Sequence, residues 1–288
     1  MIYLLLAVTA SSLILISFKV FEKLGIDSIT AITINYFAGA VFGYNSIGWQ
    51  VGYQDIITAN WFPMSLLTGF ILISAFVLVS LSTKRAGIAI TAISSRMAVI
   101  ISVLAGIFLF QDKAGILKLA GICIAIVAFY LTTRKDRIGK QEIFVLLLPF
   151  AVFIFMGLND VVMKITQFYF TGSENEADQV RYVSTAFVVS FLIGLPVLFF
   201  RACRNKQKIN LKSIASGLFL GILNWLSAYY LMMGLSVMEV SVFIPLVNIS
   251  VVCISAMAGY FIFDEKLSSA NWVGVVAALI AIVMIARG

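Results

Sequence analysis

Charged side chains stand inside apolar runs at two places in the chain. Arg96 lies within "ITAISSRMAVIISVLAG", and Asp160 and Lys164 lie within "FMGLNDVVMKITQFYF". In a helix that crosses a bilayer, such a charge costs at least about 2.5 kcal/mol, so it is expected to face the protein interior or a water-filled cavity. The planar guanidinium of Arg96 is suited to bind a carboxylate or a phosphate. The alternative role for Arg96 is a buried ion pair that locks two parts of the chain together.

Asp160 and Lys164 are four residues apart, so in a helix they share one face. They can form a self-contained ion pair. Alternatively, Asp160 binds and releases a proton, because desolvation raises the pKa of a carboxyl group and a neighbouring cation lowers it. Both interpretations remain open, and the second makes protons a candidate coupling ion.

Uncharged polar and aromatic side chains recur in the middle of other apolar runs. Such groups either join helices by hydrogen bonds or give a cavity its polar contacts. Trp225 and Tyr229 are one helical turn apart with Asn224 beside them, which favours a cavity wall. The candidate substrate-binding residues are Arg96, Asn35, Ser95, Asn159, Asn224, Trp225, Tyr229 and Asn248.

Two further residues have candidate roles near the start of one apolar run. Glu239 follows "SVM" with the spacing of a capping box, so it is a candidate for helix capping or for coupling. Pro245 removes one backbone hydrogen bond and is expected to bend or open its helix, which makes it a candidate hinge.

Composition restricts the class of protein. Of 288 residues, 62% are hydrophobic and 11% are charged, and the mean hydropathy is +1.07. Soluble domains do not reach such values, so we expect an all-α integral membrane protein. The absence of histidine and the scattered cysteines exclude histidine relays and close cysteine metal sites, and we expect no cofactor and no metal. The sequence lacks the HExxH, GxSxG and P-loop motifs that would favour an enzyme. Its excess of positive charge is explained by membrane topology, so no nucleic-acid partner is expected.

About 20 apolar residues are needed to cross a bilayer core of about 30 Å, and the chain has room for ten such helices. Three aromatic residues flank helix ends and are expected to anchor them at the membrane interface, namely Trp49, Tyr53 and Trp61. The predicted helices span residues 2–22, 28–44, 63–83, 86–110, 114–133, 142–167, 178–200, 211–234, 236–262 and 269–286.

An internal repeat relates the two halves of the chain. "FLFQDKAGILKLAGICIAI" begins at Phe108, and "YFIFDEKLSSANWVGVVAALIAI" begins at Tyr260. A weaker match aligns "LISFK", which ends at Lys19, with "DVVMK", which ends at Lys164. Each half then holds five helices, and an odd number gives the halves opposite orientations in the membrane. Residues 1–137 and 138–288 are therefore expected to form two inverted repeats, as in many secondary transporters.

These motifs resemble the drug/metabolite transporter superfamily, in particular its ten-helix EamA-like branch. One shared mark is a lysine late in helices one and six. The other follows helices four and nine, where an acidic residue and a lysine are followed by seven residues and then a glycine. The family has glycine before the acidic residue, where this chain has Gln111 and Asp264. The resemblance implies export or uptake of small metabolites without ATP hydrolysis.

The distribution of Lys and Arg predicts the orientation, because cytoplasmic connections carry an excess of them. The connections after the odd-numbered helices hold fourteen of the twenty, whereas the opposite side holds Lys113, Lys118, Arg181 and Arg287. Both termini are therefore expected outside the cytoplasm, against the arrangement that the family resemblance implies. The fourteen are Lys19, Lys23, Lys84, Arg85, Arg134, Lys135, Arg137, Lys140, Arg201, Arg204, Lys206, Lys208, Lys212 and Lys266.

The sequence thus favours a secondary transporter in the bacterial inner membrane that moves a small anionic or zwitterionic metabolite, such as an amino acid, by alternating access. The expected partners are that metabolite and the lipid bilayer, with the protein as a monomer or a homodimer. The alternatives are a broad exporter of lipophilic cations and, from another class, an intramembrane enzyme or a receptor.

Overall fold

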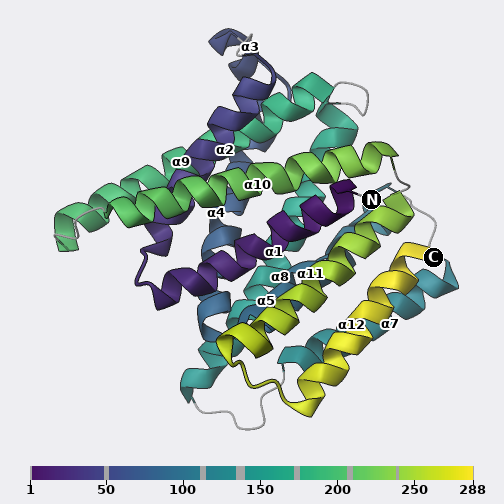
Figure 1. Cartoon of the computed structure of the whole chain (residues 1–288). Coiled ribbons are helices and arrows are strands. Elements are labelled where there is room, and N and C mark those ends of the chain that lie inside the picture. The colour runs from purple at the N-terminus through teal and green to yellow at the C-terminus, as the bar shows by residue number, and fades with distance from the viewer. Residues whose placement is uncertain are drawn as a thin grey trace. The chain divides into compact units, whose positions relative to one another are not determined.

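The computed structural model describes residues 2–48, 52–110, 115–133, 140–171, 176–205, 210–237 and 240–287. These residues fold into helices, and they contain no β-strand (Figure 1). The α-helices are α1 (Ile2–Lys23), α2 (Ser28–Ser46), α3 (Tyr53–Ile57), α4 (Phe62–Arg85), α5 (Ile88–Met97), α6 (Val99–Phe110), α7 (Ile116–Thr133), α8 (Lys140–Thr166), α9 (Glu176–Asn205), α10 (Leu211–Val237), α11 (Val240–Phe263) and α12 (Ser269–Arg287). A short π-helix, η1 (Gln167–Thr171), extends α8.

The expected all-α membrane class is confirmed. Each of the ten predicted helices has a counterpart whose ends differ by a few residues, although the predicted helix 86–110 is divided into α5 and α6. Within the described residues, α7 and α12 are shorter apolar helices, and seven stretches are long and apolar enough to cross a bilayer. The seven are Ile2–Lys23, Phe62–Arg85, Ile88–Leu109, Leu147–Thr171, Ala177–Arg201, Leu211–Leu231 and Leu246–Phe263.

The chain forms two compact units. Unit 1 comprises Met1–Lys19, Leu78–Gly157 and Leu226–Gly288, and unit 2 comprises Val20–Val77 and Leu158–Trp225. Each unit takes segments from both predicted halves of the chain. The division into two five-helix repeats stays a prediction.

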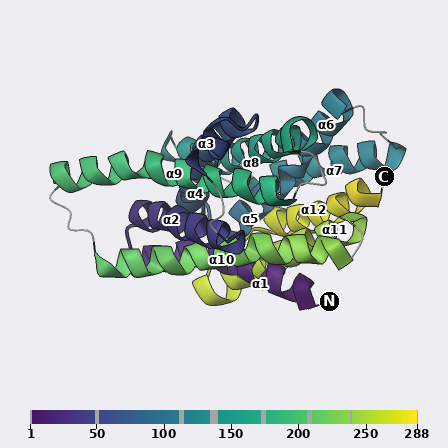
Figure 2. The same ribbon diagram turned by 90° about the horizontal axis from the view of Figure 1, so that it is seen from above.

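The core of unit 1 is built from α5, α7, α11 and α12. Helices α7 and α12 lie side by side (Figures 1 and 2), and small residues allow this close approach: a Cβ added at Gly121 would lie 2.9 Å from the backbone nitrogen of Ile285. Ile93 and Met97 of α5 are buried in the same apolar cluster. The packing therefore fixes α5, the helix that carries Arg96.

In unit 2, glycines bring α2 close to its neighbours. Helix α2 contacts the first half of α10, where Gly217 and Gly221 form a GxxxG pair. A Cβ added at Gly221 would lie 2.5 Å from the Cβ of Ala38. On the α9 side, a Cβ added at Gly194 would lie 2.5 Å from Oγ1 of Thr33. Close backbone contact of this kind replaces the hydrophobic driving force that lipid does not supply.

The start of α2 is fixed by Asp27, which lies in the connection between α1 and α2. Its carboxylate accepts hydrogen bonds from the hydroxyl of Thr30 at 2.7 Å and from Nη1 of Arg201 at 3.0 Å, and it caps the helix through the Thr30 N–H. Burial raises the pKa of the Asp27 carboxyl, but the hydrogen bonds from Thr30 and Arg201 and the charge of Arg201 outweigh it. The pKa of Asp27 therefore lies below its ordinary value.

Asp27→Ala is expected to lower the free energy of unfolding by about 1 kcal/mol at neutral pH, because α2 loses its cap. Asp27→Asn keeps a capping group and loses only the charge, so its loss should be smaller. The folded-state pKa of Asp27 is below its unfolded-state value of about 3.9. The charge therefore contributes fully to the free energy of unfolding above about pH 3.9, and this contribution disappears as the pH falls through the folded-state pKa. The difference between wild type and Asp27→Asn, measured by thermal unfolding in detergent, should therefore narrow below about pH 4.

The matched control is Asp178→Ala. Its partner Arg181 is three residues away in the same helix, and such a pair contributes a few tenths of a kcal/mol. A difference between wild type and Asp27→Asn that does not change with pH would contradict the assigned charge interaction.

Candidate functional site

Arg96 and Asn248 meet within unit 1. Arg96 lies in the last turn of α5 and is half-buried, and Nη1 donates a hydrogen bond to Oδ1 of Asn248 on α11 at 3.1 Å. Asn248 is 8% exposed. Its amide oxygen is a neutral acceptor, so this bond orients the guanidinium without neutralising it. Two of the predicted site residues, 152 positions apart in the sequence, are thus brought together.

The backbone changes directly after Arg96. Helix α5 ends at Met97 and α6 begins at Val99, and the N–H of Ile101 bonds to the carbonyl of Ala98 at 2.9 Å, which is the tighter spacing of a 3₁₀ turn. The single predicted helix 86–110 is therefore wrong at this point. The backbone of Ala98 stays in the right-handed helical region (φ −50°, ψ −22°), so α5 and α6 continue one apolar stretch, Ile88–Leu109, with a local irregularity.

The serines before Arg96 explain part of this interruption. Ser94 donates its hydroxyl hydrogen bond to the carbonyl of Ile90 at 2.8 Å, and Ser95 donates to the carbonyl of Ala92 at 2.9 Å. Such bonds compete with the helical ladder and bend helices. The hydroxyl of Ser95, a predicted substrate contact, is used in this way.

In unit 2, the amide of Asn35 is completely buried in α2. Within the described part of the chain, neither Nδ2 nor Oδ1 of Asn35 has a hydrogen-bond partner. Asn159 of α8 is also buried, and its Nδ2 reaches only the sulfur of Met163, at 3.5 Å. A buried amide without partners costs about 1–3 kcal/mol, so these groups call for a bound water or a ligand.

The aromatic candidates on α10 have different surroundings. A Cβ added at Gly43 would lie 3.6 Å from the Trp225 ring, so Trp225 packs against α2 within unit 2. Asn224 beside it is half-buried. Tyr229 is 41% exposed and stacks edge-on against Tyr230. Cavity lining by these three residues stays a prediction.

The structure describes three of the four predicted coupling and hinge residues. On α8, Asp160 is exposed and Lys164 is half-buried. Pro245 lies within α11, which runs from Val240 to Phe263. Glu239 lies outside the described residues. The coupling and hinge roles stay predictions.

A polar cluster in unit 2 was missed by sequence reasoning. The hydroxyl of Tyr182 on α9 is hydrogen-bonded to that of Thr68 on α4 and accepts one from Thr166 on α8 at 3.4 Å. Trp61 packs edge-on against the ring of Tyr182 and is 4% exposed. The expectation of an interface anchor is therefore wrong for Trp61, because this ring is enclosed by protein. Trp49 and the side chain of Tyr53 lie outside the described residues. Single threonines in apolar helices give no sequence signal of such a cluster.

Comparison with known proteins agrees with this architecture. The profile of the EamA-like transporter family matches residues 143–287, which is half of the chain. The chain belongs to the EamA-like transporter family. It is also 24% identical over 288 residues to an uncharacterized protein of Haemophilus influenzae, covering 97% of this chain and 95% of that protein. A known crystal structure with 12% identity superposes with a TM-score of 0.60 and covers 98% of each chain, which shows a shared fold.

The buried amides of Asn35 and Asn248 should respond differently to replacement by leucine. Asn35→Leu is expected to leave the free energy of unfolding unchanged or to raise it by about 1 kcal/mol, because it removes a buried amide that has no partners. Asn248→Leu is expected to lower it by about 1–3 kcal/mol, because the hydrogen bond from Arg96 loses its amide acceptor. Thermal unfolding of the purified variants in detergent measures both. Equal destabilisation by the two changes would show that Asn35 has a structural role.

Proposed function

We propose that this EamA-like membrane transporter is a secondary transporter of small anionic or zwitterionic metabolites, such as amino acids, working by alternating access without ATP. The hydrogen bond from Arg96 to Asn248 is the observation that carries the proposal. It presents a guanidinium, in a stretch long and apolar enough to cross a bilayer, to a neutral amide.

The chemistry of Arg96 favours a substrate with a carboxylate. A guanidinium binds a carboxylate through two parallel N–H···O bonds, and such charge-assisted bonds are about twice as strong as neutral ones. Asn248 accepts a hydrogen bond from one of the five N–H donors of this guanidinium and thereby orients the group.

Alternating access needs elements that change conformation. We infer that residues 1–137 and 138–288 are inverted five-helix repeats whose relative movement exposes the substrate to each side in turn. The interruption at Ala98 and the proline at Pro245 are candidate hinges. Asp160, Lys164 and Glu239 are candidates for coupling, with protons as the ion.

The first test is a ligand panel on the purified protein in detergent. Carboxylate-bearing compounds, amino acids among them, are expected to raise the thermal stability of the wild type, since a ligand at about 100 times its dissociation constant adds about 2.7 kcal/mol. Arg96→Gln should weaken this binding about tenfold or more, because one charge-assisted contact is worth about 1.5–3 kcal/mol.

Two variants complete this test. Asn248→Asp places a carboxylate opposite Arg96, so the variant should stay folded while its binding of anions weakens. Arg181→Gln removes an arginine that pairs with Asp178 at 3.0 Å, and it should bind as the wild type does. Stabilisation by lipophilic cations alone would favour the drug-export alternative and would contradict the assigned role of Arg96.

The second test concerns orientation. We propose that the protein lies in the bacterial inner membrane with both termini outside the cytoplasm, because most of its Lys and Arg lie on the opposite side. A C-terminal fusion to a reporter that is active only in the cytoplasm should be silent, and a fusion to a periplasmic reporter should be active. The reverse pattern would contradict this orientation.

A further inference from the structure

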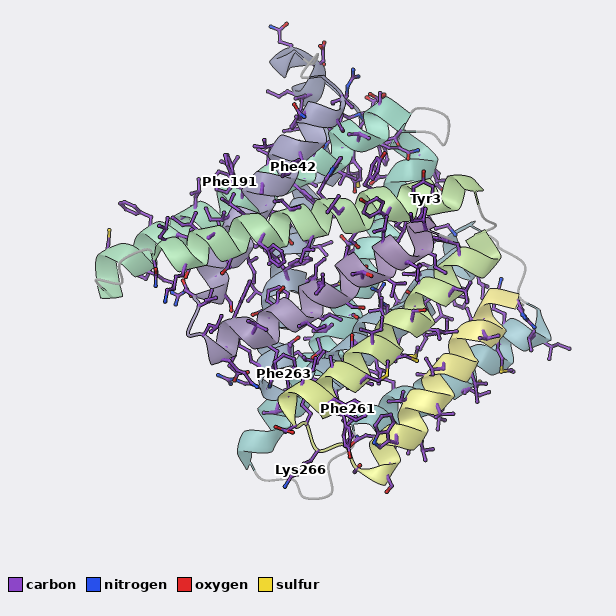
Figure 3. The ribbon with its side chains drawn as sticks, viewed as in Figure 1. Tyr3, Phe42, Phe191, Phe261, Phe263 and Lys266 are labelled. Carbon is purple, nitrogen blue, oxygen red and sulfur yellow. The ribbon has the colours of Figure 1, made fainter. Side chains whose placement is uncertain are left out.

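A polar cavity of about 360 Å³ lies within unit 1, apart from Arg96 and Asn248. Three separate segments line it: the last turns of α1, the turn from α4 to α5, and the connection from α11 to α12. Figure 3 shows Lys266 in the last of these segments. The charged lining residues are Lys19, Lys84, Arg85, Glu265 and Lys266.

Backbone turns bring the three segments together. Gly87 has a φ of +106°, and Asp264 has a φ of +54°, so Asp264 adopts the left-handed conformation at the position where the EamA-like pattern has glycine. A Cβ added at Gly87 or at Gly259 would lie 2.7 Å from Oε2 of Glu265. Both glycines therefore make room for the Glu265 carboxylate.

The Glu265 carboxylate is held by the protein itself. Its two oxygens accept hydrogen bonds from the N–H of Ile88 at 2.9 and 3.0 Å, so it occupies the N-terminus of α5. Nζ of Lys19 lies 3.7 Å from Oε1 of Glu265 and donates a hydrogen bond to the carbonyl of Lys84 at 3.3 Å. The side chains of Lys19 and Glu265 are only 16% and 13% exposed. The acidic residue of the family motif thus ties α1, α5 and the connection after α11 together.

The cavity keeps a surplus of positive charge. Four cationic side chains and one carboxylate line it, a formal excess of three charges. These charges share one cavity, and its volume is in the range of small-ligand sites. Asn271 at its wall bonds to Ser268 and to the carbonyl of Leu131, so four of the five charged groups that line the cavity are cations.

We propose that this cavity binds a phosphate group through Lys84, Arg85 and Lys266. A phosphate has the charge and the acceptor oxygens to satisfy several Lys and Arg side chains at once. The group belongs either to the headgroup of an anionic phospholipid or to a soluble phosphate. Basic pockets at the cytoplasmic ends of membrane helices bind lipid headgroups in this way. The proposal is independent of the transported substrate.

The test uses thermal stability of the full-length protein in a neutral detergent with two probes. One probe is inorganic phosphate, compared with chloride at the same ionic strength. The other is phosphatidylglycerol in mixed micelles, compared with phosphatidylcholine. At least one phosphate-bearing probe should raise the unfolding temperature in a saturable way.

Variants locate the binding. Lys266→Gln and Arg85→Gln should each weaken binding of the active probe about fivefold. Lys212→Gln is the matched control, because Lys212 is exposed, lies outside the cavity and is on the same predicted side of the membrane. It should bind as the wild type does.

Each outcome decides the proposal. Stabilisation by phosphatidylglycerol alone assigns the cavity to a lipid headgroup, stabilisation by phosphate alone assigns it to a soluble ligand, and both together assign it to the shared phosphate group. Absence of stabilisation by either probe would overturn the proposal. It would also be overturned if Lys212→Gln weakened binding as much as Lys266→Gln, because the effect would then be one of net charge.

Discussion

Hydrocarbon does not form hydrogen bonds, so every polar group that this chain carries into a bilayer must find its partners within the protein or on a ligand. The helical fold satisfies this requirement for the backbone. Side chains must satisfy it individually, and the structure does so in three ways: serines and threonines bond to carbonyls of the preceding turn, Tyr182 bonds to Thr68, and Arg96 bonds to Asn248. Asn35 does none of these among the described residues, which distinguishes it from the polar groups that only join helices.

Close packing makes this requirement stricter. Lipid gives no hydrophobic force that holds helices together, so contact depends on small residues such as Gly217 and Gly221, which let α2 approach α10 closely. Helices this close leave little room for water. A polar side chain buried near such a contact without hydrogen-bond partners is therefore costly. The backbone of Asn35 lies at this contact, and its amide has no partner among the described residues.

Much of the fold was predictable, because an apolar run of about 20 residues has few other interpretations than a membrane helix. The interruption at Ala98 was not predictable, because no glycine or proline lies there. The structural features that accompany it are hydrogen bonds from the hydroxyls of two serines to backbone carbonyls. For the site, the sequence indicated which polar residues were unusual, and Arg96 and Asn248 were among them. Their pairing depends on the packing of α5 against α11, and the burial of Trp61 depends on Tyr182, neither of which a local pattern contains.

In the proposed mechanism, Arg96 binds the anionic group of the transported compound. The most direct measurement is exchange in proteoliposomes, in which an unlabelled carboxylate that stabilises the purified protein is loaded inside and its labelled form is supplied outside. Wild-type protein should accumulate the label. Arg96→Gln should do so at least about tenfold more slowly at the same low substrate concentration, and Arg181→Gln should match the wild type. Equal exchange by wild type and Arg96→Gln would show that Arg96 does not bind the substrate.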